Sequence, residues 1–103
     1  MARYGAVNIA GKSGASYKFI AYSLDTIFRR GRAAVYVVTR RRQVHDGSPF
    51  KHRKIGIDQT GDLRRLLADC DGLELVRGAN CICVHDETDP QARLAIQNDL
   101  RTM

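Results

Sequence analysis

A dense run of cations lies in the middle of the chain, and its chemistry suits the binding of phosphates. Residues 40–54 hold one acid, Asp46, and six cations: Arg40, Arg41, Arg42, Lys51, Arg53 and Lys54. Such a patch contacts the phosphates of a nucleic acid, with an affinity that weakens steeply with salt and with little sequence preference. No aromatic partner for base stacking is evident beside it, so we expect backbone contact rather than base recognition. The alternative is a solvated surface that only keeps the protein soluble.

Three residues with metal-binding side chains alternate near the end of the chain, as Cys81-Ile-Cys83-Val-His85. On one strand, alternate side chains start about 6.6 Å apart. That spacing is wide for neighbouring ligands of a zinc ion, whose bonds are about 2.0–2.3 Å long. A fourth ligand is also not evident. We therefore expect no metal here, and cysteines that pack as small hydrophobic side chains.

Residues 6–13, Ala-Val-Asn-Ile-Ala-Gly-Lys-Ser, satisfy a permissive form of the phosphate-loop pattern. That loop needs a strand, then backbone amides that point inward, then the N-terminus of a helix. Here Val7-Asn8-Ile9 is typical of a strand, and an alternating aromatic segment follows Ser13. We expect a hairpin turn rather than a nucleotide site.

The N-terminal third must supply the elements around that turn. Residues 3–10 predict a short strand, and Gly11-Lys12-Ser13-Gly14 predicts a turn. Residues 16–24 alternate as a strand does, although Tyr17, Ala21 and Leu24 also fit a helix that continues to Phe28. The aromatic and β-branched content favours a second strand, and so a hairpin.

From residue 33 onward the pattern predicts strand, strand, helix, strand, helix. Residues 33–39 form an apolar, β-branched run typical of a buried strand, and residues 52–57 form a strand that pairs with it. Asp46-Gly47 and Ser48-Pro49 mark the turn between them. The third strand covers residues 80–85.

Two helices complete this part. The first is capped by Thr60-Gly61-Asp62, ends at Asp71-Gly72 and presents an apolar stripe made of Leu63, Leu66, Leu67 and Cys70. The second begins at Asp89-Pro90, with aspartate as cap and proline in its first turn. Its expected inner face consists of Ala92, Ala95, Ile96 and Leu100.

Composition sets the class and the partners. The 103 residues have room for one core, so we expect a single α+β domain, 1–103, with a small and mainly antiparallel sheet: three core strands plus an N-terminal hairpin, packed by two or three helices. Residues 1–54 hold 12 Lys and Arg against two acids, whereas residues 55–103 hold five against nine. This asymmetry favours a polyanionic partner. The lack of a long apolar run or signal peptide, and the odd number of cysteines, three, predict a cytoplasmic protein without a membrane partner.

Residues 33–101 resemble the GIY-YIG nuclease family. Ala-Val-Tyr36-Val-Val is similar to the family's first motif strand. Residues 55–67, Ile-Gly-Ile-Asp-Gln-Thr-Gly-Asp-Leu-Arg-Arg-Leu-Leu, are similar to its second strand and the helix after it. Residues 89–100 are similar to the helix that carries its glutamate. The run Gln-Thr-Gly-Asp-Leu, 59–63, is the most specific part, and residues 1–32 would be an N-terminal extension.

The resemblance implies a phosphodiesterase site that is mostly absent here. In the family, two tyrosines and an arginine surround the scissile phosphate, and a glutamate holds a divalent metal ion. The first tyrosine is present as Tyr36, but the other three positions fall on Gly56, Leu66 and Gln97. A register on Lys54-Ile55-Gly56 restores a glycine but places lysine at the second tyrosine. Arg65 neighbours the arginine position, about 100° away around the helix.

We therefore expect a non-catalytic domain that binds nucleic acid, DNA rather than RNA, through the cations of residues 40–54 together with Arg64 and Arg65, and without a cofactor. One alternative is a protein-interaction or oligomerisation module. A second is a divergent DNA endonuclease that uses Tyr36, Arg65 and an acid such as Asp58 or Glu87, the only case in which Mg²⁺ is expected.

Overall fold

The computed structural model describes residues 2–43, 45–48, 50–68 and 78–101. Its elements, in chain order, are β1 (Arg3–Ala10), β2 (Ser16–Ser23), β3 (Ala34–Arg42), β4 (Lys51–Thr60), α1 (Leu63–Ala68), β5 (Cys81–Asp86) and α3 (Pro90–Leu100). The order of the described elements from residue 34 onward is the predicted one. Within these ranges, no helix has the length and apolar character needed to cross a membrane.

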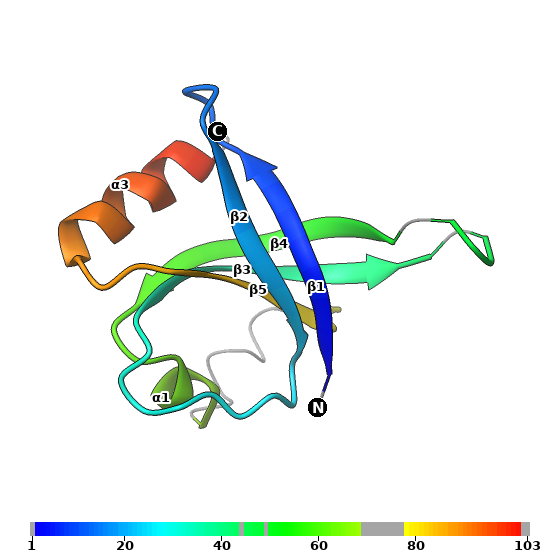
Figure 1. Cartoon of the computed structure of the whole chain (residues 1–103), viewed down its shortest axis with the longest axis horizontal. Coiled ribbons are helices and arrows are strands. Elements are labelled where there is room, and N and C mark those ends of the chain that lie inside the picture. Colours follow the sequence, from blue (N-terminus) through cyan, green and yellow to red (C-terminus); the bar gives the residue numbers. More distant parts are fainter. Residues whose placement is uncertain (1, 44, 49, 69–77, 102–103) are drawn as a thin grey trace.

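The five strands form a single sheet in the order β1-β2-β5-β3-β4, and every neighbouring pair is antiparallel. The predicted α+β class and antiparallel sheet are thus confirmed. The N-terminal hairpin is an integral part of the sheet, because β2 pairs with β5. The strand that comes last in the chain, β5, therefore lies in the middle of the sheet (Figure 1).

The ambiguous segment 16–24 is a strand, as the aromatic and β-branched content favoured. In β2, Phe19 and Ala21 are fully buried whereas Lys18 is exposed, which is the period-two pattern of a strand. β2 pairs with β1 through a turn that contains Gly14, whose φ of 91° suits glycine. The hairpin turn predicted for residues 11–14 is confirmed.

Each face of the sheet has its own apolar core. On one face, Leu100 and Ile96 of α3 pack against strand residues that include Phe19, Val35 and Val37. On the other face, Leu63 and Leu66 of α1 pack on a cluster that contains Phe28, Ala34, Tyr36, Val38, Ile82 and Val84. We call these the α3 face and the α1 face.

Helix α1 begins as the sequence predicts. The Asp62 carboxylate accepts hydrogen bonds from the backbone N–H groups of Arg64 (3.1 Å) and Arg65 (3.4 Å), which caps the first turn. Leu63 is buried and Leu66 is half-buried, as their spacing predicted. The predicted contribution of Cys70 and the stop at Asp71-Gly72 lie outside the described residues, as do the side-chain surroundings of Leu67.

Helix α3 begins at the predicted cap, but its inner face differs from the prediction. Asp89 accepts a hydrogen bond from Gln91 N at 3.0 Å, and Pro90 follows it. The buried residues are Arg93, Gln97 and Leu100, while Ala95, which was expected inside, is exposed. The reason is hydrogen bonding. Arg93 and Gln97 find partners under the helix, so burying them leaves no polar group unpaired.

The hairpin β3–β4 extends past the rest of the sheet. The pairing of β3 with β5 ends at Thr39 and Cys81, whereas its pairing with β4 continues to Arg42 and Lys51. The residues beyond Thr39 therefore form a two-stranded ribbon that projects from the domain (Figure 1). We call Arg40–Arg42 and Lys51–Arg53, with the turn between them, the arm.

The side chain of Asn80 fixes the base of this arm. Its amide oxygen accepts a hydrogen bond from Arg41 N at 2.6 Å, and its amide nitrogen donates one to Arg41 O at 2.9 Å. The Asn80 side chain thus pairs with the backbone N–H and C=O groups of Arg41, just beyond the point where the pairing of β3 with β5 ends.

Candidate nucleic-acid interface

Strand register divides the six central cations between the two faces of the sheet. Arg40 is paired with Arg53, and Arg42 with Lys51. Residues that are directly opposite share a face, so these four exposed side chains lie together on the α1 face of the arm. At its base, Arg40 Nη1 donates a hydrogen bond to Gly78 O at 3.4 Å. Arg41 lies on the opposite face of the ribbon.

A β-bulge creates this division. Val38 pairs with Gly56 but Thr39 pairs with Lys54, so Ile55 is the extra residue. The bulge inverts the alternation of β4, which places Lys51 and Arg53 on the α1 face and His52 and Lys54 on the α3 face. The prediction that all six cations converge on one patch is therefore corrected to four on one face and two on the other.

Arg41 is held between two aromatic rings. Its guanidinium carbon lies 3.8 Å from the ring centroid of Tyr4 and 3.4 Å from that of Phe50. The expectation that no aromatic side chain lies beside the cations is therefore corrected. Phe50 directly precedes Lys51 in the chain, but Tyr4 comes from β1, three places away from β3 in the sheet order. Stacking of this kind stabilises the position of the arginine and occupies a face of each ring.

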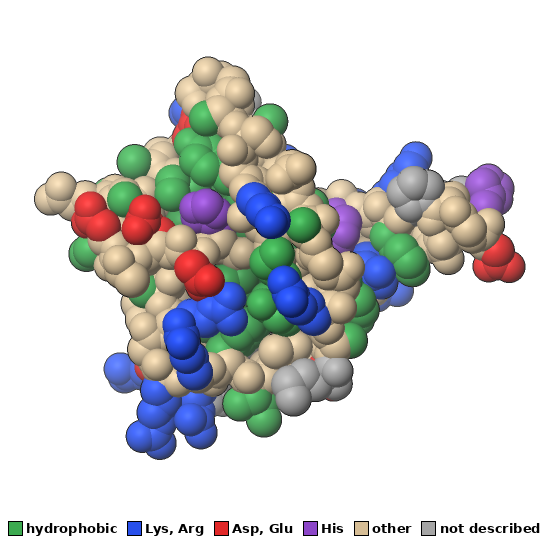
Figure 2. Space-filling model, in the orientation of Figure 1, with side chains coloured by type: hydrophobic (Ala, Val, Ile, Leu, Met, Phe, Trp, Pro, Cys, Tyr) green, Lys and Arg blue, Asp and Glu red, His purple; other side chains and the backbone are tan. Residues whose placement is uncertain are grey.

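The predicted cations of α1, Arg64 and Arg65, are exposed on the helix that covers the α1 face. They thus share that side of the sheet with Arg40, Arg42, Lys51 and Arg53. Figure 2 shows Lys and Arg side chains over the position of α1 and on the arm, with further ones over the middle of the domain between them.

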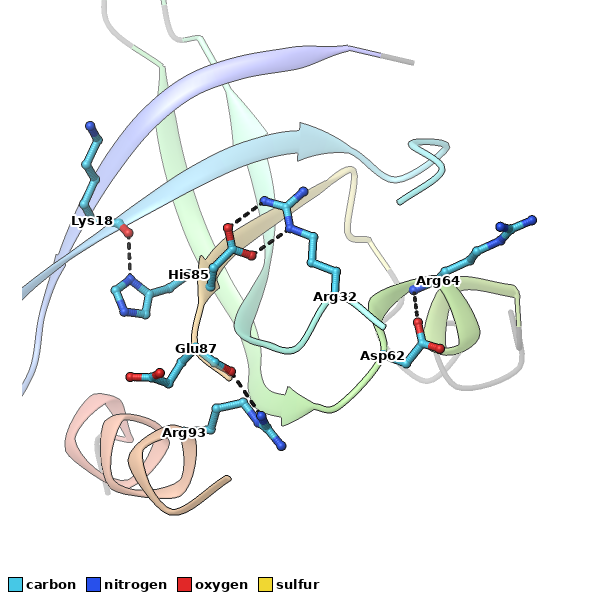
Figure 3. A network of polar contacts seen from close by, with 8 residues as sticks. Lys18, Arg32, Asp62, Arg64, His85, Glu87 and Arg93 are labelled. Atoms are coloured by element: carbon cyan, nitrogen blue, oxygen red, sulfur yellow. Dashed lines mark hydrogen bonds and ion pairs between the residues drawn. The ribbon is translucent and has the colours of Figure 1, made fainter. Parts of the chain in front are cut away.

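Two other arginines are engaged in contacts within the fold (Figure 3). Arg32 binds Asp86 in a bidentate manner, with Nε at 2.7 Å and Nη2 at 3.1 Å from the two carboxylate oxygens. Arg93 is 7% exposed and donates to Gln59 and to the carbonyls of Glu87 and Thr88. Arg32 thus connects the segment between β2 and β3 to β5, and Arg93 connects α3 to β4. We do not count either arginine as a phosphate ligand.

Two of the positions implied by the GIY-YIG resemblance, Tyr36 and Gln97, each lie next to Asp58. Tyr36 is paired with Asp58 across β3 and β4, and Gln97 donates a hydrogen bond to Asp58 Oδ1 at 3.2 Å. Tyr36 is only 8% exposed, and burial, together with the Asp58 charge, raises the pKa of its hydroxyl to about 12.

The arginine position is filled by an apolar contact. Leu66 packs in the core cluster that also contains Tyr36, while Arg65 faces solvent. Glu87, the other acid considered from sequence, lies in the connection between β5 and α3, and its carbonyl accepts from Arg93. The structure thus places Asp58 next to both Tyr36 and Gln97, whereas Arg65 is exposed on α1.

The turn that resembles a phosphate loop is occupied by a carboxylate of the protein itself. Asp99 accepts hydrogen bonds from Ser13 N (2.8 Å), Ser13 Oγ (2.6 Å) and the Tyr17 hydroxyl (2.8 Å). These bonds lower the pKa of the Asp99 carboxyl below its usual range, the Ser13 hydroxyl being the largest cause. The expected hairpin turn is confirmed, and its anion-binding groups already have an anionic partner.

The two cysteines of β5 differ from His85 in burial. Cys81 and Cys83 are fully buried free thiols on the α3 face. His85 lies at the rim, where its Nδ1 is 2.9 Å from Lys18 O (Figure 3) and its ring contacts Tyr17 and Phe19.

Comparisons with known proteins add no assignment: no family model, no curated protein and no solved structure matches this chain.

Proposed function

We propose that this domain binds the phosphate backbone of nucleic acid through the α1 face of its arm. The observation that carries the proposal is the strand register, which aligns Arg40 with Arg53 and Arg42 with Lys51 on one exposed face. Four cations on a projecting ribbon can approach adjacent phosphates without rearrangement of the core. Arg64 and Arg65 on the same side extend the cationic surface.

The proposed contact is electrostatic rather than base-specific. Arg41 already stacks on Tyr4 and Phe50, which leaves these rings less free to stack on unpaired bases. DNA is the proposed ligand in preference to RNA, since the family that residues 33–101 resemble acts on DNA.

Three observations support a binding role over catalysis within a GIY-YIG-like framework. The Tyr36 side chain is only 8% exposed and its pKa is raised, both of which disfavour its use as a nucleophile or acid near neutral pH. Leu66 fills the arginine position with an apolar side chain. Gln97 offers an amide, already bonded to Asp58, where the family has a metal-binding carboxylate.

Fluorescence anisotropy with labelled DNA and RNA duplexes and single strands, across a salt series, tests the proposal. The double variant Arg40→Gln/Arg53→Gln is expected to weaken binding and to reduce the slope of log K against log salt by roughly 2, about one unit for each phosphate that is no longer neutralised. The matched control, Lys12→Gln/Lys18→Gln, removes the same charge around the β1–β2 turn and is expected to leave the slope near that of the wild type.

Two results would contradict the proposal. One is the absence of binding at low salt, which would favour the interaction-module alternative, to be followed by light scattering. The other is an equal decrease in affinity in both double variants, which would show a response to net charge alone. Plasmid nicking with Mg²⁺ or Mn²⁺ that is abolished in Tyr36→Phe would favour the divergent nuclease instead.

A further inference from the structure

A cluster of three soft or borderline metal ligands lies on the α3 face, apart from the cationic face of the arm. One ring nitrogen of His52 and the Sγ atoms of Cys81 and Cys83 all lie within 4.8 Å of one another. His52 is half-buried and the two cysteines are buried. Both cysteines belong to β5, whereas His52 belongs to β4, two places away in the sheet order. The residue spacing within β5 alone therefore did not reveal this cluster.

The distances suit a single ion after small side-chain adjustments. Bonds of about 2.3 Å to sulfur and about 2.0 Å to nitrogen, at tetrahedral angles, place ligand atoms roughly 3.5–3.8 Å apart. The ligand atoms, which lie within 4.8 Å of one another, therefore need to approach by roughly 1.3 Å at most, a distance on the scale of small side-chain rotations.

A hydrogen bond restrains the histidine of this cluster. The Thr39 hydroxyl lies 2.9 Å from His52 Nδ1 and so limits rotation of the imidazole ring. Thr39 and His52 both line the cavity beside Cys83, so the ring is held next to the thiols.

A route and an open coordination position are also present. A cavity of about 340 Å³ is lined by His52 and Cys83, together with Thr39, Lys54 and residues 7–10 of β1. An ion can enter through it, and a water molecule or small ligand can complete the coordination from that side. Three protein ligands and one exchangeable position are typical of reactive rather than purely structural zinc sites.

We propose that His52, Cys81 and Cys83 bind one thiophilic d¹⁰ metal ion, Zn²⁺ or Cu⁺. Soft thiolates with one imidazole select these ions over Mg²⁺ or Ca²⁺. Binding releases the two thiol protons to solvent and forms two metal–sulfur bonds and one metal–nitrogen bond. The site is independent of phosphate binding by Arg40, Arg42, Lys51 and Arg53, which lie on the other face.

Metal titration of the full-length, reduced protein in a Cys70→Ser background tests the site. Co²⁺ is expected to give thiolate-to-metal charge-transfer absorption at one equivalent and to be displaced by Zn²⁺. A separate anaerobic arm adds Cu⁺ in competition with a chromogenic chelator, and so distinguishes the two ions. His52→Gln is expected to weaken binding at least tenfold, whereas the matched control His85→Gln, on the same face of β5, retains it.

Protection of the thiols from alkylation gives a second measurement that needs no substitution of Cys81 or Cys83, either of which could prevent folding. In the Cys70→Ser protein, one equivalent of the bound metal is expected to protect both remaining thiols from alkylation, as measured by mass spectrometry. Absence of the charge-transfer band with Co²⁺ and of any Cu⁺ uptake would overturn the proposal. Binding that survives His52→Gln but is abolished in His85→Gln would overturn it too.

Discussion

Arg40 lies directly opposite Arg53 across the β3–β4 ladder, on the solvent-exposed arm. Like charges directly opposite one another destabilise a strand pair, and the pairing of Arg42 with Lys51 repeats this unfavourable arrangement further out along the arm. Two such pairs side by side are expected to lower the stability of the fold while they present positive charge on one exposed face, which supports the polyanionic ligand that we propose.

Removing one charge of this pair is expected to stabilise the free protein. Arg53→Gln should raise the free energy of unfolding by about 0.5 kcal/mol at low salt, because it relieves the repulsion with Arg40. The gain should disappear near 1 M salt, where the Debye length is about 3 Å. Urea denaturation at both salt concentrations measures it, with Arg53→Lys as the charge-preserving control. Destabilisation of Arg53→Gln at low salt would argue against net repulsion.

Arg41 is expected to behave differently from Arg40, although the two are adjacent. Arg41→Gln should lower stability by about 1 kcal/mol, because the guanidinium no longer stacks on Tyr4 and Phe50. Its effect on the salt slope of nucleic-acid binding should be smaller than that of Arg40→Gln. Thermal unfolding and anisotropy on the two single variants provide the comparison. The reverse ranking would place the phosphate contacts on the α3 face.

The β1–β2 turn is expected to depend on the end of α3. A Cβ on Gly11 would lie 2.1 Å from Asp99 Oδ2, so Gly11→Ala forces the carboxylate away from Ser13 and Tyr17. We expect the free energy of unfolding to fall by roughly 1–3 kcal/mol. In an Asp99→Ala background the same substitution should cost much less, which a double-mutant cycle measures. Additive effects would show that the two sites are not coupled.

Alkaline pH is expected to destabilise the protein through Tyr36. The folded-state pKa of about 12 exceeds the ordinary value of 10.0, so the folded state retains this proton where the unfolded state has released it. The contribution is fully present below pH 10 and is lost as the pH rises towards 12. Urea denaturation between about pH 9 and roughly pH 11.5 should show a shallower decline in Tyr36→Phe than in wild type. Parallel declines would mean that Tyr36 is accessible in the native state.

Local patterns sufficed to predict the elements. The apolar, β-branched run before Thr39, the Asp62 cap and the Asp89-Pro90 start each depend on residues close together in the chain, and the structure places strands and helices there. The predicted inner face of α3 was right for Ile96 and Leu100, but it missed Arg93 and Gln97 because they are polar in sequence. Their burial depends on Gln59 and Asp58, partners 34 and 39 residues away.

The candidate sites depended on register, which residue spacing does not encode. The bulge at Ile55 decides on which face Arg53 and Lys54 lie, and a shift by one residue exchanges the faces. Likewise, His52 lies close to Cys81 and Cys83 although β3 separates β4 from β5 in the sheet. Hydrophobic periodicity along the chain does not predict which residues of different strands lie close together.

The central place of β5 has a consequence for how the chain folds. During synthesis, the hairpins β1–β2 and β3–β4 can each form from local contacts, but the strand that joins them is made last. Until residues 81–86 emerge, β2 and β3 each present an unpaired edge to the surroundings. Completion of the domain is then the insertion of one strand between two waiting hairpins, a non-local step that should set the folding rate. A nascent chain stopped before residue 81 would present open strand edges where the finished protein has a continuous sheet, which makes the interval before β5 emerges the period of greatest exposure to aggregation.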